Sequence, residues 1–584
     1  MDDTFLRYYE NELDHLRVSS QRFAAEFPKI ARRLQLGEQE CADPYVERLL
    51  EGVAFLTARI SRKLDDAQAE LPETLLNQIA PEFNAPIASR AVLHLRTEEP
   101  GAVLPAGTPF SAPTSLPDKL SCCYTLREPF TASGISIRSC AWDDGPALEL
   151  AARAGLEAEG ALRLSLDCGP HGPQDDVNFF IRLPESAAGA LLELLTEACA
   201  GIIAESPGQG TSTLPASALT EPAAPQDAMA LPPVAEYFIA PEQFSFFRIR
   251  HLRRLLPESG SADLLLLLRR RPDERLRLLL RGEQPLLTDC VRAINVFERR
   301  MDRALPSWKP AEHLVADVTG NQNFEVLRVL GAAAYDGDNA KLFDMYPFYL
   351  ADDLSMPGGT ERLNYFATHR EAPVAPPRHR VSPYTGSEVY IQLSGPDYTE
   401  RRDSIGSLSV RALCSNRDLP LFLRRDARLS GEGAQAAFAS APGRPRAPLT
   451  RHGARWLALA LARLTPATLA AYGEQALPAV LRTLLHHLHP EEDEAARRQV
   501  EGITAVRIGA TSRPVPVLGD LCIMRGWHFD ITINEQAFGD SGVYHFARAL
   551  AGFLLSLTEI NSFTTVAVRT GTRCIRTWQQ QEPA

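Results

Sequence analysis

Residues 40–66 (ECADPYVERLLEGVAFLTARISRKLDD) constrain the fold more than any other stretch, because a strong helix start leads directly into one long apolar stripe. Asp43 can accept a capping hydrogen bond, and Pro44 suits the first helical position. Apolar side chains then recur at steps of three and four residues, namely Val46, Leu49, Val53, Leu56, Ile60 and Leu64. The sequence therefore predicts a helix of about six turns whose apolar face must be covered by another surface.

Gly52, Glu47 and Glu51 also lie within this predicted helix. Gly52 costs about 1 kcal/mol relative to alanine there, so we expect the backbone of a neighbouring element to approach it closely. Glu47 and Glu51 lie four residues apart and imitate a catalytic acid/base pair, but exposed helix carboxylates lack the distinct environments that such catalysis needs. We therefore assign Glu47, Glu51, Gly52, Leu56 and Ile60 to a protein-interaction surface.

Composition limits the partners and the compartment. A chain of 584 residues exceeds what one hydrophobic core usually serves, so we expect about three or four packed units. The net charge of −12, from 61 basic and 73 acidic side chains, opposes nonspecific binding to nucleic acid or anionic lipid. No apolar run approaches the roughly 20 residues of a membrane-spanning helix, and the start lacks a secretory signal. Ten scattered cysteines favour a reducing cytoplasm. We expect no nucleic-acid partner and no membrane insertion.

The order of sequence patterns predicts a multidomain α+β protein. Residues 1–88 have helical spacing, which Pro28 interrupts, and form an N-terminal helical bundle segment. Residues 89–204 and 236–450 read as β-rich modules of short strands between turns, the second with long loops. Between these two modules, residues 205–235 contain six prolines and little apolar surface. We predict a Pro-rich loop or linker there, without a packed element.

Residues 451–584 predict a C-terminal module of mixed α/β type. A helical stretch comes first, and residues 527–534 then alternate between apolar and polar side chains, as in a half-buried strand. Ser541 can cap a following helix, and residues 563–568 predict a closing strand.

Candidate chemistry is sparse. Gly539-Asp540-Ser541-Gly542 imitates the nucleophile turn of trypsin-like proteases, but it lacks the following glycine and an upstream histidine in context, so a plain turn is favoured. GxSxG, P-loop, HExxH and Rossmann patterns are absent. His486 and His489 could share a helix face as metal ligands, yet histidines near a helix C-terminus are favourable without metal. We predict no catalytic residue, no cofactor and no bound metal.

Several further segments occur in a fixed order along the chain. They are RYYENEL (7–13), FPKIARRLQL (27–36), APEQFSFFRI (240–249), INVFER (294–299), YTGSEVYIQL (384–393), LSVRALCSNRDLP (408–420), RRQVEGI (497–503) and LTEINSFTTV (557–566). With residues 40–66, these segments resemble the TssF family, also called VasA or ImpG, of the bacterial type VI secretion system. Residues 103–110 (VLPAGTPF) also resemble a β-module of wedge proteins in contractile phage tails.

This resemblance implies a structural subunit of the secretion system baseplate, which acts by assembly and by gating sheath contraction. It implies TssG, TssK and a second TssF copy as wedge partners, with TssE and the spike as further baseplate contacts. It also implies a cytoplasmic protein associated with the inner face of the cell envelope through the apparatus. Two alternatives remain open at this point: a wedge protein of another contractile injection machine or phage tail, and an enzyme of an unfamiliar class.

Overall fold

The structure is a computed structural model whose chain divides into two compact units, Met1–Leu76 and Asn77–Ala584. It describes all residues except 1–2, 30–43, 69–74, 78, 98–100, 117–119, 207–209, 228, 302–311, 316–322, 349–363, 372–381, 383, 426, 432–436, 451–459, 462–463, 491–492, 518–519, 572 and 580–584. Each unit is described by itself. No described helix is long and apolar enough to cross a membrane.

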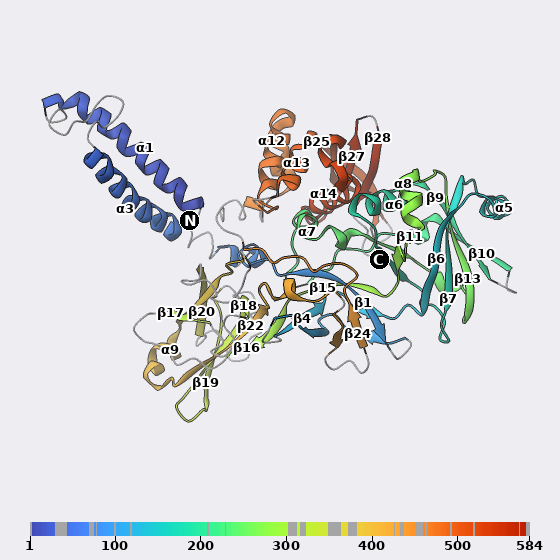
Figure 1. The fold of residues 1–584 in the computed structure, drawn as a ribbon, viewed down its shortest axis with the longest axis horizontal. Helices are drawn as coiled ribbons and strands as arrows, with labels where there is room; N and C mark the ends of the chain where they lie inside the picture. Colours follow the sequence, from blue (N-terminus) through green and yellow to red (C-terminus); the bar gives the residue numbers. More distant parts are fainter. Residues whose placement is uncertain are drawn as a thin grey trace. The chain divides into compact units, whose positions relative to one another are not determined.

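The first unit contains two long helices that lie side by side, α1 (Asp3–Glu26) and α3 (Pro44–Gln68) (Figure 1). Helix α3 begins at Pro44, as the sequence predicts. Helix α1 ends at Glu26, two residues before Pro28, because the residue preceding a proline is disfavoured in helical conformation. The proposed cap Asp43 lies outside the described residues.

The second unit is built mainly of sheets, which together with its helices confirms the α+β class. One sheet closes into a barrel of β1 (Arg90–Thr97), β15 (Cys290–Ile294), β4 (Ser121–Leu126), β3 (Pro109–Pro113), β23 (Leu429–Gly431) and β24 (Ala437–Ser440). These strands come from both regions that the sequence suggests as separate β-rich modules. The barrel therefore joins the two regions in one sheet.

Two further sheets pack with helices around the largest apolar core. One contains β10 (Gly210–Pro215), β9 (Cys199–Ser206), β13 (Gly260–Leu268), β7 (Gly160–Cys168) and β6 (Ile135–Asp143), and the other β11 (Leu219–Thr220), β12 (Phe246–Ile249), β8 (Val177–Ile181) and β14 (Leu286–Leu287). The accompanying helices are α5 (Pro146–Arg153), α6 (Glu185–Ala198), α7 (Pro233–Ile239) and α8 (Glu274–Leu280). Leu164 of β7 and Leu266 of β13 are both fully buried in this core.

A seven-stranded sheet forms a separate core around Phe366 and Ile391. Its order is β16 (Phe297–Arg300), β22 (Ser407–Ser415), β18 (Glu325–Tyr335), β19 (Lys341–Pro347), β20 (Asn364–Glu371), β21 (Glu388–Ser394) and β17 (Glu312–Leu314), with α9 (Pro396–Arg401) beside it. The short strands β2 (Val103–Leu104) and β5 (Phe130–Thr131) pair with each other. Gly107, at φ 84°, makes the turn from β2 into β3.

The C-terminal part combines helices with a four-stranded sheet that joins the largest core. Its elements are α11 (Pro466–Ala470), α12 (Gly473–His486), α13 (Glu494–Glu501), β25 (Ile503–Val517), β26 (Asp520–Ile533), α14 (Tyr544–Ser556), β27 (Phe563–Thr570) and β28 (Arg573–Gln579). In β26, Phe529 and Ile531 are buried while His528 and Asp530 are more exposed, so the predicted alternation is confirmed.

Two predictions for this part are wrong. Ser541 does not cap α14, because Gly542 at φ 74° turns the chain and the helix begins at Tyr544, with Val543 as an N-cap that makes no side-chain bond. The strand predicted at residues 563–568 is present as β27, but it does not close the sheet, because β28 pairs along its other side. The sequence after residue 570 has too few apolar residues for its pairing with β27 to be predicted from periodicity.

The Pro-rich interval 205–235 is not the unpaired loop that the sequence predicts. Strand β10 pairs antiparallel with β9, and β11 pairs with β12. Ala218, Leu219 and Met229 are buried. The prediction failed because proline and small side chains hide a local hairpin of β9 and β10, and because β11 is covered by β12, which lies further along the chain.

Residues 219–227, which we call the strap, are held largely by arginines from two other elements, α14 and β15. Arg548 of α14 donates to the carbonyl of Pro222 at 3.0 Å. Arg292 of β15 donates to the carbonyl of Ala223 at 2.7 Å. These distant guanidinium groups supply the hydrogen bonds that a regular ladder does not. The strap is therefore a docked part of the fold.

Candidate functional site

The N-terminal hairpin of α1 and α3 contains every residue that the sequence assigns to an interaction surface. Ser61 donates to Oε1 of Glu12 at 2.7 Å, and Arg17 donates to Oε1 of Glu47 at 2.7 Å. Because the earlier residue of α1 contacts the later residue of α3, the two helices run antiparallel (Figure 1).

Small side chains of α3 form the inner face of this hairpin. Ala54 and Ala58, four residues apart, are each 0% exposed. Residues at this spacing lie on one helix face, and their small size allows α1 to approach closely. The hairpin is therefore closed by alanines and by polar contacts, and not by the apolar stripe.

The apolar stripe of α3 faces away from α1. Leu49 is 68% exposed, Val53 44%, Leu56 58% and Ile60 59%. The side chains of Val46 and Leu64, which complete the predicted stripe, lie outside the described structure. The stripe has the predicted spacing, but the described part of this chain leaves it uncovered. An exposed apolar surface of this kind is typical of protein interaction sites.

The three other predicted interaction residues have different environments. Glu47 forms an ion pair with Arg17, while Glu51 is exposed. Gly52 is also exposed, and a Cβ added to it would meet nothing within 4 Å. The close crossing that the sequence predicts at Gly52 is therefore not made by any described residue of this chain.

The predicted histidine cluster forms a hydrogen-bonded chain. Nδ1 of His486 lies 3.0 Å from Nε2 of His489, whose Nδ1 lies 2.7 Å from the carbonyl of Pro490. Nε2 of His486 lies 2.9 Å from Oε1 of Glu501. Partial burial lowers the pKa of His489. The hydrogen bond from His486 lowers the pKa of Glu501. Each ring nitrogen thus has a protein partner.

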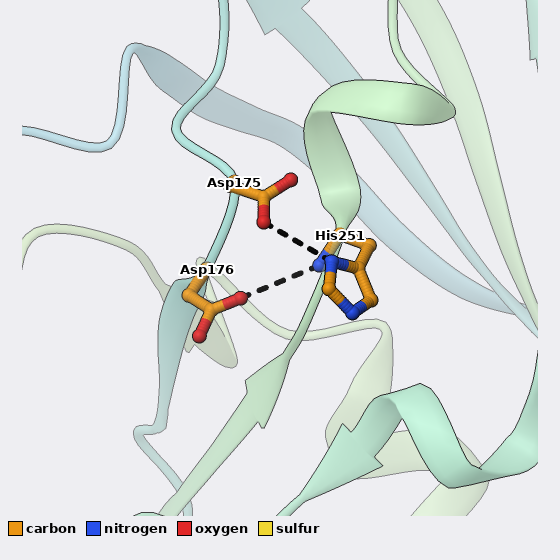
Figure 2. A group of neighbouring side chains, drawn as sticks. All are labelled: Asp175, Asp176 and His251. Carbon is orange, nitrogen blue, oxygen red and sulfur yellow. Dashed lines mark hydrogen bonds and ion pairs between the residues drawn. The ribbon is translucent and has the colours of Figure 1, made fainter.

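A second group of polar side chains was not identified from the sequence. Figure 2 shows Asp175, Asp176 and His251, whose potential ligand atoms lie within 4.8 Å of one another. Oδ2 of Asp175 lies 3.1 Å from Nδ1 of His251, and the His251 backbone N–H donates to Asp176 at 3.4 Å. His251 has a left-handed backbone at φ 60°, which these two carboxylates help to hold. The side chains are well exposed, and this exposed polar group carries no assignment beyond that structural role.

The most buried charges form a network that joins the barrel to α7. Nε of Arg90 donates to Glu236 at 2.6 Å, and Arg127 contacts the same carboxylate and donates to Asp227 at 2.5 Å. Burial alone would raise the pKa of Glu236, but the two guanidinium groups outweigh it and lower that pKa below its ordinary value. This network was not predicted, because its members are separated by up to 146 residues. It connects elements, and no ligand is needed to explain it.

The comparison with known families shows to which family the chain belongs. The family model described as "Type VI secretion system, TssF" matches residues 1–582. The chain belongs to the TssF family. A curated member, the type VI secretion system component TssF1 of Pseudomonas aeruginosa (strain PAO1), is 32% identical, with 99% of this chain and 98% of that protein aligned. Family membership favours a type VI secretion baseplate protein over a phage tail protein.

Solved structures support the same fold for TssF proteins. A chain from a type VI secretion TssK-TssF-TssG baseplate subcomplex, determined by cryo-electron microscopy, superposes with a TM-score of 0.67 at 19% identity. The match covers 92% of this chain and 99% of that one. A chain from the type VI secretion baseplate complex gives a TM-score of 0.59 at 18% identity, with 99% of each chain covered. At these identities the likeness concerns the fold.

Proposed function

We propose that this TssF protein is a structural wedge subunit of the baseplate, and that it assembles with TssG and TssK through its N-terminal hairpin. The observation that carries the proposal is the exposed apolar stripe of α3. Family membership supports the baseplate role, and the TssK-TssF-TssG subcomplex that contains a chain of similar fold supports the choice of partners.

The stripe provides the driving force for this assembly. Burying a valine, leucine or isoleucine side chain gains about 1.5–3 kcal/mol each, and the four described members of the stripe are all more than 40% exposed. Partner helices that pack on the stripe would complete an intermolecular helical bundle. Gly52 leaves open space on α3, so a partner backbone can approach there. Glu47 and Glu51 lie on the same helix and add negative charge to its surface.

The proposed mechanism is assembly and the gating of sheath contraction, without bond chemistry at this chain. In this proposal the chain is not an enzyme, acts in the cytoplasm at the inner face of the envelope, and also meets a second TssF copy, TssE and the spike. The hydrogen-bonded histidine chain and the buried ion pairs around Glu236 support a structural role, because these side chains bind one another across separate elements.

The test uses variants of the stripe in the full chain co-expressed with TssG and TssK. Leu56→Gln combined with Ile60→Gln should leave circular dichroism and the melting temperature unchanged, because both side chains are already in water. Co-purification of TssG should fall at least tenfold. Leu278→Gln is the matched control, since Leu278 is 60% exposed on α8 and lies outside the hairpin.

A second variant separates the stripe from the glycine. Gly52→Leu should stabilise the free helix by roughly 1 kcal/mol through helix propensity, because nothing in the described chain obstructs the new side chain. In the assembly the same side chain should overpack the contact and reduce TssG co-purification. Undiminished co-purification of both variants would refute the hairpin as the assembly surface.

A further inference from the structure

The β25–β26 hairpin extends beyond the sheet to which it belongs. β25 pairs with β26 from Ile503 to Val517, whereas the parallel pairing of β26 with β27 begins only at Gly526, opposite Phe563. Residues 511–525 therefore form a two-stranded arm, which we call the β-arm; residues 518–519 of its turn lie outside the described structure. Each strand of the β-arm has one outer edge.

Prolines block the outer edge of β25. Pro514 lies opposite Ile523, and Pro516 lies opposite Leu521. A proline is tolerated in a strand where its nitrogen faces away from the partner strand. Pro514 and Pro516 therefore face outward, and this edge lacks two of the N–H donors that another strand would need.

The same register leaves the outer edge of β26 open. In an antiparallel pair, two directly opposite residues point their backbone N–H and C=O groups either toward each other or away from each other. Because the backbone nitrogens of the two prolines point outward, the N–H and C=O groups of Leu521 and Ile523 also point outward, on the opposite edge. Backbone direction alternates along a strand, so the N–H and C=O groups of Arg525 point outward as well. No strand among the described residues pairs with this edge.

The side chains along this open edge include a prominent apolar group. Ile523 is 77% exposed, and its neighbours Cys522 and Arg525 are also exposed. An open strand edge with an exposed apolar residue at its centre is a template for the addition of another strand.

We propose that this open edge pairs antiparallel with the same edge of a second copy of this chain, about a twofold axis through Ile523. Ile523 then lies opposite its equivalent, and Leu521 lies opposite Arg525 of the second copy. The outward-facing groups of the two edges match in this register. The two arginines stand at opposite ends, roughly 13 Å apart along the strands, so like charges do not oppose each other.

The blocked edge of β25 favours this occupant over an unrelated strand. Twofold pairing consumes both open edges and leaves only the proline-blocked edges outside, so the four-stranded contact cannot continue to grow. An ordinary strand from another protein would expose a new open edge. Such a short contact falls well below the ~1,600 Å² of a standard stable interface, so it forms where the assembly brings two copies together. The edge pairing therefore rests on the proposed function, which supplies the assembly that holds the two copies together.

The test is disulfide trapping in the full chain co-expressed with TssG and TssK. Ile523→Cys is made in a chain in which the exposed Cys522 and Cys574 are replaced by serine. Opposite residues of a hydrogen-bonded antiparallel pair have Cα atoms about 5.5 Å apart, within disulfide range. Mild oxidation should convert most of the chain to a covalent dimer. The matched control is Ser512→Cys, which faces outward on the blocked edge and should give no dimer.

Amide hydrogen exchange tests the main-chain contact independently. The Arg525 amide should exchange at least tenfold more slowly in the assembly than in the free chain, and Ile523→Pro should restore fast exchange there. Absence of the Ile523→Cys dimer, or an equal yield from Ser512→Cys, would overturn the proposal. If TssG and TssK still co-purify in that case, the edge pairing fails and the proposed function stands.

Discussion

At the scale of single residues, the least exposed ionisable group of α14 is His545. It is 0% exposed, with Nε2 3.3 Å from the Ser245 hydroxyl. Burial, with a smaller contribution from Arg548, lowers its pKa to about 3. The folded protein therefore keeps this imidazole neutral between the ordinary histidine pKa and about pH 3, a range in which the unfolded chain protonates it.

The sign of the resulting pH effect follows directly. Below the ordinary histidine pKa of about 6.5, the unfolded chain binds a proton at His545 that the folded chain excludes. The free energy of unfolding should fall from that pH toward pH 3, with a contribution of up to about 1.4 kcal/mol per pH unit. Urea unfolding of the wild type and His545→Gln at a series of pH values measures this. The variant should show a shallower dependence, and equal slopes would contradict the prediction.

At the scale of elements, the strap shows how an irregular segment is fixed by side chains. Nε of Arg548 lies 3.4 Å from Glu221, and both side chains are only 11% exposed. Nη1 of Arg548 also donates to the carbonyl of Phe244 at 2.7 Å. One guanidinium group thus connects α14, the strap and the segment preceding β12.

Removal of that guanidinium should release the strap. Arg548→Met leaves Glu221 with fewer partners in a largely buried site, and breaking a buried pair in this way costs about 3–5 kcal/mol. Limited proteolysis should leave residues 219–227 intact in the wild type and cut them in the variant. Arg507→Met is the control, because Arg507 and Glu474 are each 71% exposed and such pairs contribute about 0–1 kcal/mol. Wild-type cleavage within the strap would show that it is not docked.

At the scale of the whole molecule, the core of the second unit is independent of the hairpin. None of the described apolar clusters of this unit includes a residue before Asn77. The barrel, the helix-covered sheets and the C-terminal sheet therefore draw their apolar burial from residues 77–584 alone. The hairpin can serve assembly without contributing to those cores.

A chain that begins at Asn77 should consequently fold by itself. Residues 77–584 should be soluble and retain the main thermal unfolding transition of the full chain, because none of the described apolar clusters of that unit includes a residue before Asn77. The same truncation should abolish co-purification of TssG. Circular dichroism melting and affinity purification measure the two outcomes. A melting temperature well below that of the full chain would contradict independent folding.

The parts of this protein that were predictable are those in which local patterns coincide with the structure. Helix α3 was predictable because its proline start and three-to-four spacing are local features. The alternation in β26 was predictable for the same reason. The cap at Ser541 was not, because the glycine that follows it adopts a positive φ and delays the helix.

By itself, the sequence determined the α+β class, the apolar stripe as a pattern, and the family through ordered motifs. Only the tertiary structure decided that the stripe faces solvent while Ala54 and Ala58 close the hairpin, because spacing defines a face but not its partner. Only the tertiary structure shows that Arg548 binds the strap and that Arg90 forms an ion pair with Glu236. Such contacts depend on which distant segments meet, and no local pattern encodes that choice.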